Sequence, residues 1–163
     1  MSDKMSLEKS LVELQRMIAR AWGEQTFKDK QHSLSQNSLS QNEFDYLMCI
    51  YIAQSTEPDP ADTKHDDSTH LSALAADMQV KKSSASLMLN KLEKRGLVER
   101  VTCRYDARAQ HVLLTGIGEK LFLACQQQVY TTMSDSIKSK LGTQEYAQLE
   151  QLLEKVCAIS KVK

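Results

Sequence analysis

The stretch LSALAADMQVKKSSASLMLNKLEKRGLVER, residues 71–100, decides the fold because it contains two short helical patterns in succession. Apolar residues recur at steps of three and four over residues 71–78 and again over residues 85–92, which is the periodicity of an amphipathic helix. Residues 79–82 interrupt this periodicity. We therefore expect two helices that are joined by a tight turn.

The ends of these two helices carry recognisable signals. Ser72 is expected to cap the first helix, and Ser83 or Ser84 the second, because a serine hydroxyl accepts a hydrogen bond from a free backbone N–H. Gly96 stands where a glycine commonly follows the C-terminus of a helix. The second helix is thus predicted to end just before Gly96.

A β-hairpin is predicted to follow. Residues 97–103 and 110–114 favour strands, and the bend between them contains Arg104, Asp106 and Arg108. Turns are usually made with Gly, Pro or Asn, so three charged residues in a bend are unusual. Two helices, a tight turn and a hairpin together make a winged helix-turn-helix.

Helical patterns also flank this segment. We expect helices over residues 6–21, 41–54, 115–136 and 144–160, and loops over residues 32–41 and 55–69. Ser40 followed by Glu43 predicts a capping box at the second of these helices. Thr115 is expected to cap the third, and Gly142 is expected to separate the last two.

Length and charge set further limits. The chain has 163 residues, enough for one domain with helical additions. No apolar run approaches the ~18 residues of a membrane span, and the N-terminus lacks the apolar core of a secretory signal, so we expect a cytoplasmic protein. The net charge is zero, but residues 71–114 carry a net +4 and residues 55–70 a net −4. A local basic region on a neutral protein is compatible with nucleic-acid binding.

The second helix of the pair has a face suited to DNA. Its first turn directs free N–H groups and the positive end of the helix dipole outward, and phosphate is a natural ligand there. Small hydroxyl groups allow close approach to a duplex, and lysines neutralise phosphates. The side chains expected to contact DNA are Lys81, Lys82, Ser83, Ser84, Ser86 and Asn90. Taken alone, each of these side chains could equally belong to a helix cap or to a solvated helix face. The charged hairpin beside them favours the interpretation that they contact DNA.

These residues resemble the MarR family of bacterial winged helix-turn-helix regulators. The resemblance rests on Leu74–Ala75, on the serine-rich start of the second helix at Ser83–Ser86, and on LEKRGLVER at Leu92–Arg100. It continues with DAR at Asp106–Arg108 and with LTGIG at Leu114–Gly118.

The resemblance implies a mainly α fold with a small β-hairpin wing, in which a winged helix-turn-helix is joined to an α-helical dimerisation region. Residues 40–114 form the DNA-binding domain on this interpretation, and residues 1–39 and 115–163 supply the helices that interlock two protomers. The implied partners are a second copy of the chain and double-stranded DNA with a roughly palindromic operator. Repression is the commoner outcome among relatives, and the 55–69 loop is longer than the family's usual connection.

Individual positions carry over from the family. Arg108 matches the wing arginine that enters the minor groove, and Asp106 matches the acid that orients it by a salt bridge. A guanidinium at a hairpin tip suits a narrow, electronegative minor groove, and Arg104 is expected to contact a phosphate. Leu87 stands where many members have a polar residue, so it either touches a thymine methyl or covers apolar surface. Asn90 is then the main base reader, suited to adenine.

Many MarR-like proteins release DNA when a small aromatic acid or phenol binds. The side chains expected to line such a pocket are Trp22, Phe44, Met48 and Tyr51. The same spacing is also typical of an ordinary helical core. A redox- or metal-responsive regulator of the same fold, and a winged helix that binds protein rather than DNA, are the alternatives. No catalytic motif supports an enzyme, and no cofactor is expected.

The remaining reactive side chains are given a structural interpretation. The four cysteines are Cys49, Cys103, Cys125 and Cys157. They form no C-x-x-C pair and have no His at zinc-finger spacing, so they are expected to be reduced thiols in apolar surroundings, with Cys103 the best redox candidate. Metal-ligand types also occur near the acidic loop, at His65, Asp66, Asp67 and His70. A flexible acidic loop explains these better, and no metal site is predicted.

Overall fold

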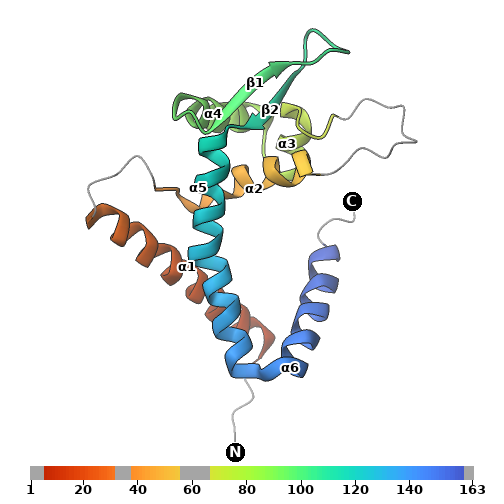
Figure 1. The fold of residues 1–163 in the computed structure, drawn as a ribbon. Coiled ribbons are helices and arrows are strands. Elements are labelled where there is room, and N and C mark those ends of the chain that lie inside the picture. Colours follow the sequence, from red (N-terminus) through yellow and green to blue (C-terminus); the bar gives the residue numbers. More distant parts are fainter. Residues whose placement is uncertain (1–5, 32–37, 56–66, 160–163) are drawn as a thin grey trace, which may run out of the picture. The chain divides into compact units, whose positions relative to one another are not determined.

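The computed structural model describes residues 6–31, 38–55 and 67–159 (Figure 1). The elements follow in the order α1 (Leu7–Gln31), α2 (Gln41–Ser55), α3 (Leu71–Asp77), α4 (Lys82–Lys94), β1 (Val98–Thr102), β2 (Gln110–Leu114), α5 (Gly116–Gln126), the π-helical turn η1 (Gln127–Thr131) and α6 (Thr132–Ile159). The two strands form an antiparallel hairpin, which confirms the predicted mainly α fold with a β-hairpin wing. The chain divides into two compact units, residues 1–125 and 126–163.

α2 begins with the predicted capping box. The Ser40 hydroxyl accepts a hydrogen bond from the Glu43 N–H (3.3 Å), and the Glu43 carboxylate accepts one from the Ser40 N–H (2.9 Å). The Ser40 hydroxyl also donates to that carboxylate (3.0 Å). Two backbone N–H groups at the helix start are satisfied in this reciprocal way.

The predicted cap of α3 is wrong. The residue before the helix is His70, whose extended backbone (φ −71°, ψ 148°) forms an antiparallel bridge with His111 of β2. The Val112 N–H also bonds to the Thr69 carbonyl at 3.0 Å. Because this pairing with β2 holds the backbone extended up to His70, the helix begins at the next residue, and Ser72 lies inside its first turn. Tertiary pairing here overrides the capping preference of serine.

The predicted cap of α4 is also wrong. The residue before this helix is Lys81, again extended (φ −65°, ψ 142°), and it makes no side-chain cap hydrogen bond. Ser83 and Ser84 therefore lie within the first turn instead of preceding it. Their hydroxyl groups are at the exposed helix start, where they are not the caps that we expected.

The turn between α3 and α4 uses a left-handed residue that is not glycine. Gln79 has a φ of 54°. Its N–H bonds to the Ala76 carbonyl, and the Val80 N–H bonds to the Ala75 carbonyl, both at 3.0 Å. These two bonds close the C-terminus of α3 in Schellman geometry. The end of α4 has the same geometry at the predicted glycine, Gly96, with a φ of 70°.

The hairpin has one buried and one exposed face. Its register pairs Val98 with Leu114 and Thr102 with Gln110. Val98 and Val112 are buried, whereas Val101 is exposed. This alternation is typical of an antiparallel sheet that covers a core on one side. The residues between the strands project as a tip beyond α3 and α4 (Figure 1).

Thr115 holds the junction after the hairpin. Its hydroxyl donates to the Gly96 carbonyl (2.6 Å) and accepts from the Gly118 N–H (3.0 Å). Its own N–H bonds to the Leu97 carbonyl at 3.1 Å. Thr115 therefore caps α5, as predicted, and ties the start of that helix to the end of α4.

The outer helices differ from their predicted bounds. α1 continues to Gln31 instead of ending near residue 21. The helix predicted over residues 115–136 is interrupted by η1, a π turn that widens a helix locally without ending it. Gly142, with a φ of 73°, kinks α6 where a break was predicted. Within the described ranges, no helix combines the length and apolar character needed to cross a membrane.

The core of the first unit is formed by the apolar faces of α2, α3, α4, α5 and the hairpin. Its fully buried side chains include Phe44, Leu47, Ile50, Leu74, Leu89, Leu92, Val112 and Phe122. The predicted inner faces of α3 and α4 are thus confirmed at Leu74, Leu89 and Leu92. Burial of these positions leaves the opposite face of α4 towards solvent.

Candidate nucleic-acid interface

The outer face of α4 is polar and accessible. Ala85, Leu89 and Leu92 point into the core, so the residues between them face outward. The exposed side chains along this face and at its start are Lys81, Lys82, Ser83, Ser84, Leu87, Asn90, Lys91 and Lys94, and Ser86 is half-buried. The N-terminal turn combines exposed hydroxyl groups, two lysines and the positive end of the helix dipole. This combination is suited to binding a phosphate.

Leu87 does not serve the core. The Leu87 side chain is 72% exposed. It therefore does not cover apolar surface of the described chain, which was one of the two interpretations of this residue. An exposed leucine on a polar helix face provides apolar contact area to whatever docks there, and a thymine methyl is one such partner.

Asn90 is held by a residue that we did not predict. Arg100 Nη2 donates to Asn90 Oδ1 at 2.6 Å, and Arg100 Nε lies 3.2 Å from Glu93 Oε2. These contacts join the exposed side of α4 to β1. Part of the Asn90 amide is therefore already engaged within the chain, which limits its bidentate pairing with adenine. No local sequence pattern pointed to Arg100, because the contact depends on how β1 packs beside α4.

The wing tip is organised by Asp106. Its Oδ1 accepts a hydrogen bond from the Arg108 backbone N–H at 2.9 Å, and its carbonyl accepts one from the Ala109 N–H at 2.9 Å. Among the described residues the Asp106 and Arg108 side chains form no ion pair in the absence of DNA, so the salt bridge stays a prediction for the DNA complex. Asp106 instead shapes the turn, as aspartate commonly does when it bonds the N–H two residues ahead. Arg104 and Arg108 are both exposed at this tip.

Tyr105 also lies at the wing tip, with 80% of its surface exposed. Tyr105 is not among the residues predicted from the sequence to contact DNA. An aromatic ring in a basic hairpin tip is a signal that could have been used, because such rings contact sugars and bases.

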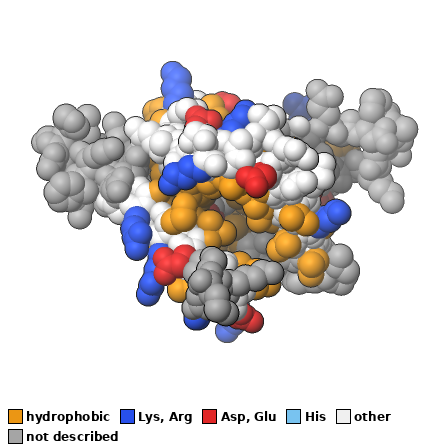
Figure 2. Space-filling model, turned by 90° about the horizontal axis from the view of Figure 1, so that it is seen from below, with side chains coloured by type: hydrophobic (Ala, Val, Ile, Leu, Met, Phe, Trp, Pro, Cys, Tyr) orange, Lys and Arg blue, Asp and Glu red, His pale blue; other side chains and the backbone are white. Residues whose placement is uncertain are grey.

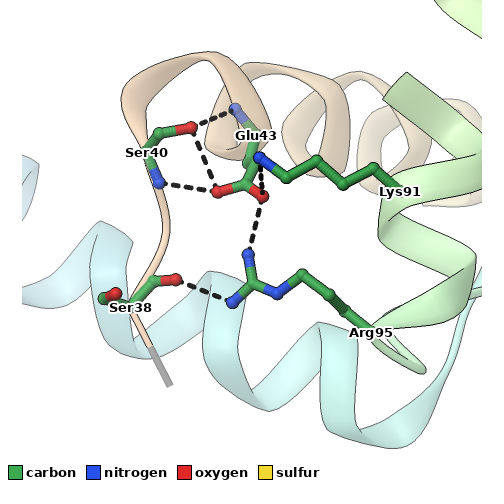
Figure 3. Close-up of polar contacts among 5 residues, drawn as sticks. All are labelled: Ser38, Ser40, Glu43, Lys91 and Arg95. Carbon is green, nitrogen blue, oxygen red and sulfur yellow. Dashed lines mark hydrogen bonds and ion pairs between the residues drawn. The ribbon is translucent and has the colours of Figure 1, made fainter. Parts of the chain in front are cut away.

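A buried carboxylate fixes α4 against α2 (Figure 3). Glu43 Oε1 lies 2.7 Å from Arg95 Nη1 and 3.1 Å from Lys91 Nζ, and Arg95 Nη2 donates to the Ser38 carbonyl at 2.7 Å. Burial alone raises the pKa of Glu43, but the hydrogen bonds from Ser40, Arg95 and Lys91 outweigh it and lower the pKa to about 2. Glu43 is thus ionised at neutral pH and anchors the C-terminal half of α4.

The residues expected to line an effector pocket are brought together only in part. Trp22 and Phe44 meet edge-to-face with ring centroids 5.3 Å apart. Phe44 and Tyr51 both contact Phe122, with ring centroids 5.0 and 4.9 Å apart. Met48 is 40% exposed and is not a buried member of the group. Phe122 was missed as a member because α5 is distant in sequence from α1 and α2.

The cysteines are free thiols. Cys103 and Cys125 are buried, Cys49 is half-buried and Cys157 is exposed. Burial raises the pKa of Cys49 to about 11, with a smaller contribution from the charge of Asp77. A thiol with so high a pKa is almost entirely protonated at neutral pH, so Cys49 is unreactive.

Ligand-type side chains converge at a place that we did not predict. His70, Cys103 and His111 offer ligand atoms that all lie within 4.8 Å of one another. Of the acidic-loop residues considered earlier, His65 and Asp66 lie outside the described residues, and Asp67 Oδ1 lies 3.1 Å from His70 Nδ1. The three residues come from the start of α3, the end of β1 and β2, so sequence spacing gave no signal for the cluster.

Comparisons with known proteins show what part of the chain is similar to a family and which solved structures share its fold. Residues 39–109 match the model of the MarR family. Wild-type MarR from E. coli in its apo form is 23% identical, with a TM-score of 0.63 and coverage of 94% of this chain and 98% of that one. The S. aureus MepR–DNA complex is 18% identical, with a TM-score of 0.64 and coverage of 95% and 98%. The transcriptional repressor CouR, bound to a 23-mer DNA duplex, is 20% identical, with a TM-score of 0.61 and coverage of 93% and 92%.

A comparison with curated proteins gave no match. The likeness to the solved structures shows that the chain has the fold of these regulators. The segment matched by the family model runs from the start of α2 to the wing tip and includes α4 and Arg108. Among these proteins, CouR is a transcriptional repressor and MepR is a transcription regulator. Residues 39–109 are therefore similar to the MarR family of winged helix-turn-helix proteins, and the chain has the fold of MarR and MepR.

Proposed function

We propose that this protein is a sequence-specific DNA-binding transcriptional regulator that acts as a homodimer on a roughly palindromic operator. The observation that carries the proposal is the exposed polar face of α4 beside a wing tip with two exposed arginines. Both belong to residues 71–114, which carry a net +4 on a chain whose total net charge is zero. Charge of this sign attracts the phosphate backbone and supplies affinity that does not depend on sequence.

The N-terminal turn of α4 is the proposed major-groove element. Lys81 and Lys82 neutralise phosphates, and Ser83 and Ser84 bond to phosphate or base edges at close range. The uncapped start of the helix supports this assignment, because its N–H groups face outward with no side-chain cap bonded to them. Leu87 adds apolar contact to a thymine methyl.

The wing is the proposed minor-groove element. Arg108 enters the groove, and Arg104 contacts a flanking phosphate. The hydrogen bond from the Arg108 N–H to Asp106 supports this role, because it fixes the backbone from which the arginine projects. A backbone held in one conformation loses less entropy when the side chain binds.

Exposed apolar surface supports the proposed homodimer. α1 and α6 each present large apolar side chains to solvent, and hydrophobic side chains are visible on the face drawn in Figure 2. These residues are Leu7, Leu11, Val12 and Met17 on α1, and Leu141, Leu152, Leu153, Val156 and Ile159 on α6. Apolar stripes of this kind usually mark an interface. Two copies place their α4 helices at half-sites about one helical turn apart.

We further propose that the regulation is repression, with release of DNA by a small aromatic acid or phenol that binds at Trp22, Phe44 and Tyr51. The family resemblance supports this part of the proposal. The ring contacts among these residues and Phe122 mean that an effector has to displace packed side chains. A rise in melting temperature with a series of aromatic acids, together with loss of operator binding, tests it. No effect of any such acid on either quantity contradicts it.

The experiment that tests DNA binding uses bound fragments selected from sheared genomic DNA and then a titration of one such fragment. We expect Arg108→Ala to weaken operator binding about 10- to 100-fold while the dimer stays intact. Arg20→Ala, on α1, removes the same charge outside the winged helix and is the matched control. Unchanged affinity of the Arg108 variant argues against the wing assignment.

Salt dependence separates this function from a winged helix that binds only protein. A DNA-binding protein loses affinity steeply as salt rises, because counterions are released from the duplex. We expect the slope to decrease by about one for each Arg108 or Lys82 that is replaced by alanine. Failure to select any DNA fragment at low salt counts against the DNA-binding function itself.

A further inference from the structure

We propose that His70, Cys103 and His111 form a binding site for a zinc-type transition metal ion at the base of the wing. His70 and Cys103 are buried and His111 is half-buried, and their ligand atoms lie within 4.8 Å of one another. Two imidazole nitrogens and one thiolate are ligands that zinc prefers. The site joins three elements, because His70 precedes α3, Cys103 follows β1 and His111 belongs to β2.

Both histidines are oriented by a second residue through the same ring atom. His70 Nδ1 lies 3.1 Å from Asp67 Oδ1, and His111 Nδ1 lies 2.7 Å from Thr69 Oγ1. Since Nδ1 of each ring makes this contact, we expect the metal to bind through Nε2, and His70 Nε2 is buried. Metal-binding histidines in proteins almost always have such a partner on the other nitrogen, which fixes the tautomer and the ring orientation.

The sulfur is prepared in a comparable way. Cys103 Sγ accepts hydrogen bonds from the Tyr105 N–H (3.3 Å) and the Asp106 N–H (3.4 Å). Backbone N–H groups directed at sulfur compensate the negative charge of a metal-bound thiolate. The thiol is therefore held by the first residues of the wing tip, in surroundings shielded from solvent.

The dimensions fit the ion after small side-chain movements. Zinc bonds imidazole nitrogen at about 2.0 Å and thiolate sulfur at about 2.3 Å, which separates tetrahedral ligand atoms by roughly 3.3–3.6 Å. The observed separations, at most 4.8 Å, close to this range by rotation of the side chains. Three protein ligands leave a fourth coordination position for a small exogenous ligand.

Occupancy of this site is expected to act on the wing. The Asp106 N–H bonds to the Cys103 sulfur, and the Asp106 carboxylate bonds to the Arg108 N–H. A metal ion on Cys103 therefore pulls on the turn from which Arg108 projects. This regulatory step rests on the proposed DNA-binding function, whereas the metal site itself does not.

The test of the site is a titration of the full-length, chelator-treated and reduced protein with zinc in competition with a chromophoric chelator. We expect one ion per chain with a dissociation constant below about 1 µM. Cobalt serves as the spectroscopic probe, because a thiolate ligand gives a sulfur-to-cobalt charge-transfer band. Cys103→Ser is expected to abolish that band and to weaken zinc binding more than about 100-fold. Cys157→Ser, at an exposed cysteine, is the matched control and is expected to retain both.

Two further variants keep the proposal testable if Cys103→Ser folds poorly by circular dichroism. Asp67→Asn is expected to retain the fold and to weaken zinc binding about 10- to 100-fold, because it removes only the carboxylate that orients His70. His111→Gln is expected to remove a ligand outright. Zinc binding that is equally tight in all three variants overturns the site. In that case His70 and His111 are held together only by their ring contact and their strand pairing.

The regulatory step has its own readout. Operator affinity is measured with the chelator-treated and the zinc-loaded protein, and we expect a change of about fivefold or more, a coupling typical of allosteric sites. Zinc binding without any change in operator affinity upholds the site and overturns its action on the wing. If neither form binds DNA, the proposed function fails and the zinc titration still decides the site.

Discussion

Gly118 lies so close to Leu97 that a Cβ atom on the glycine would stand 1.9 Å from the Leu97 carbonyl oxygen and 2.8 Å from its carbonyl carbon. The contact joins the first turn of α5 to Leu97, which lies between α4 and β1. It gives a physical reason for glycine in the LTGIG segment, because the obstacle is backbone and cannot rotate away. The same Leu97 carbonyl accepts a hydrogen bond from the Thr115 N–H, so Thr115 and Gly118 both hold the start of α5 against Leu97.

We therefore expect Gly118→Ala to destabilise the protein by about 3 kcal/mol, since overpacking against rigid backbone costs this much or more. Chemical denaturation followed by circular dichroism measures the effect. Gly116→Ala is the matched control, because an added Cβ at Gly116 meets no atom within 4 Å. Equal stability of the two variants contradicts the proposed close approach.

The local patterns were sufficient for the fold class because each of them depends on neighbours in sequence. The capping box of Ser40 and Glu43 and the terminal glycine of α4 are local in this sense, and both were predicted. The start of α3 was not, because His70 is held by pairing with His111 in β2. Local preference fails where a distant strand supplies the stronger constraint.

The candidate site divides in the same way. The accessible serines and lysines of α4 follow from helical periodicity, because an inner apolar face defines the outer one. The engagement of Asn90 by Arg100, and the convergence of Cys103 with two histidines, depend on how the hairpin lies against α3 and α4. Such contacts become visible only in three dimensions.

Gln79→Gly is expected to stabilise the protein by about 0.5–1 kcal/mol. Gln79 has a φ of 54°, a conformation that costs a residue with a Cβ roughly 1–2 kcal/mol. Glycine removes this strain, and its greater freedom in the unfolded chain offsets only part of the gain. Thermal denaturation measures the change. The control is Gln15→Gly, in the exposed middle of α1, which is expected to destabilise the protein by about 1 kcal/mol. If Gln79→Gly also destabilises the protein, the Gln79 backbone is not strained.

Stability is expected to depend on the ionisation of Glu43. Its pKa is lowered from 4.5 to about 2, so the unfolded chain binds the proton at a higher pH than the folded one. The stabilisation is complete above about pH 4.5, decreases as the pH falls towards 2, and amounts to about 3 kcal/mol. Denaturation curves at several pH values between 6 and 2.5 measure it.

Glu43→Gln provides the comparison for this pH dependence. It removes the charge that faces Arg95 and Lys91, so we expect lower stability at neutral pH and a flatter decline between about pH 4.5 and 2. Glu150→Gln, at an exposed position on α6, is the control and is expected to follow the unmodified protein. A Glu43→Gln variant with an unchanged acid transition rules out this carboxylate as its source.

The role of Asp106 at the wing tip can be separated from that of a salt-bridge partner. If Asp106 acts by accepting the Arg108 N–H, asparagine preserves that bond through its side-chain carbonyl oxygen, and alanine does not. We therefore expect Asp106→Asn to bind the operator as tightly as the unmodified protein or more tightly, since a negative charge near the phosphates is removed. Asp106→Ala is expected to bind about 5- to 10-fold more weakly, because the turn that presents Arg108 is loosened. A titration of the same operator fragment compares the three proteins, and equal weakening in both variants points instead to an ion pair between Asp106 and the Arg108 guanidinium in the DNA complex.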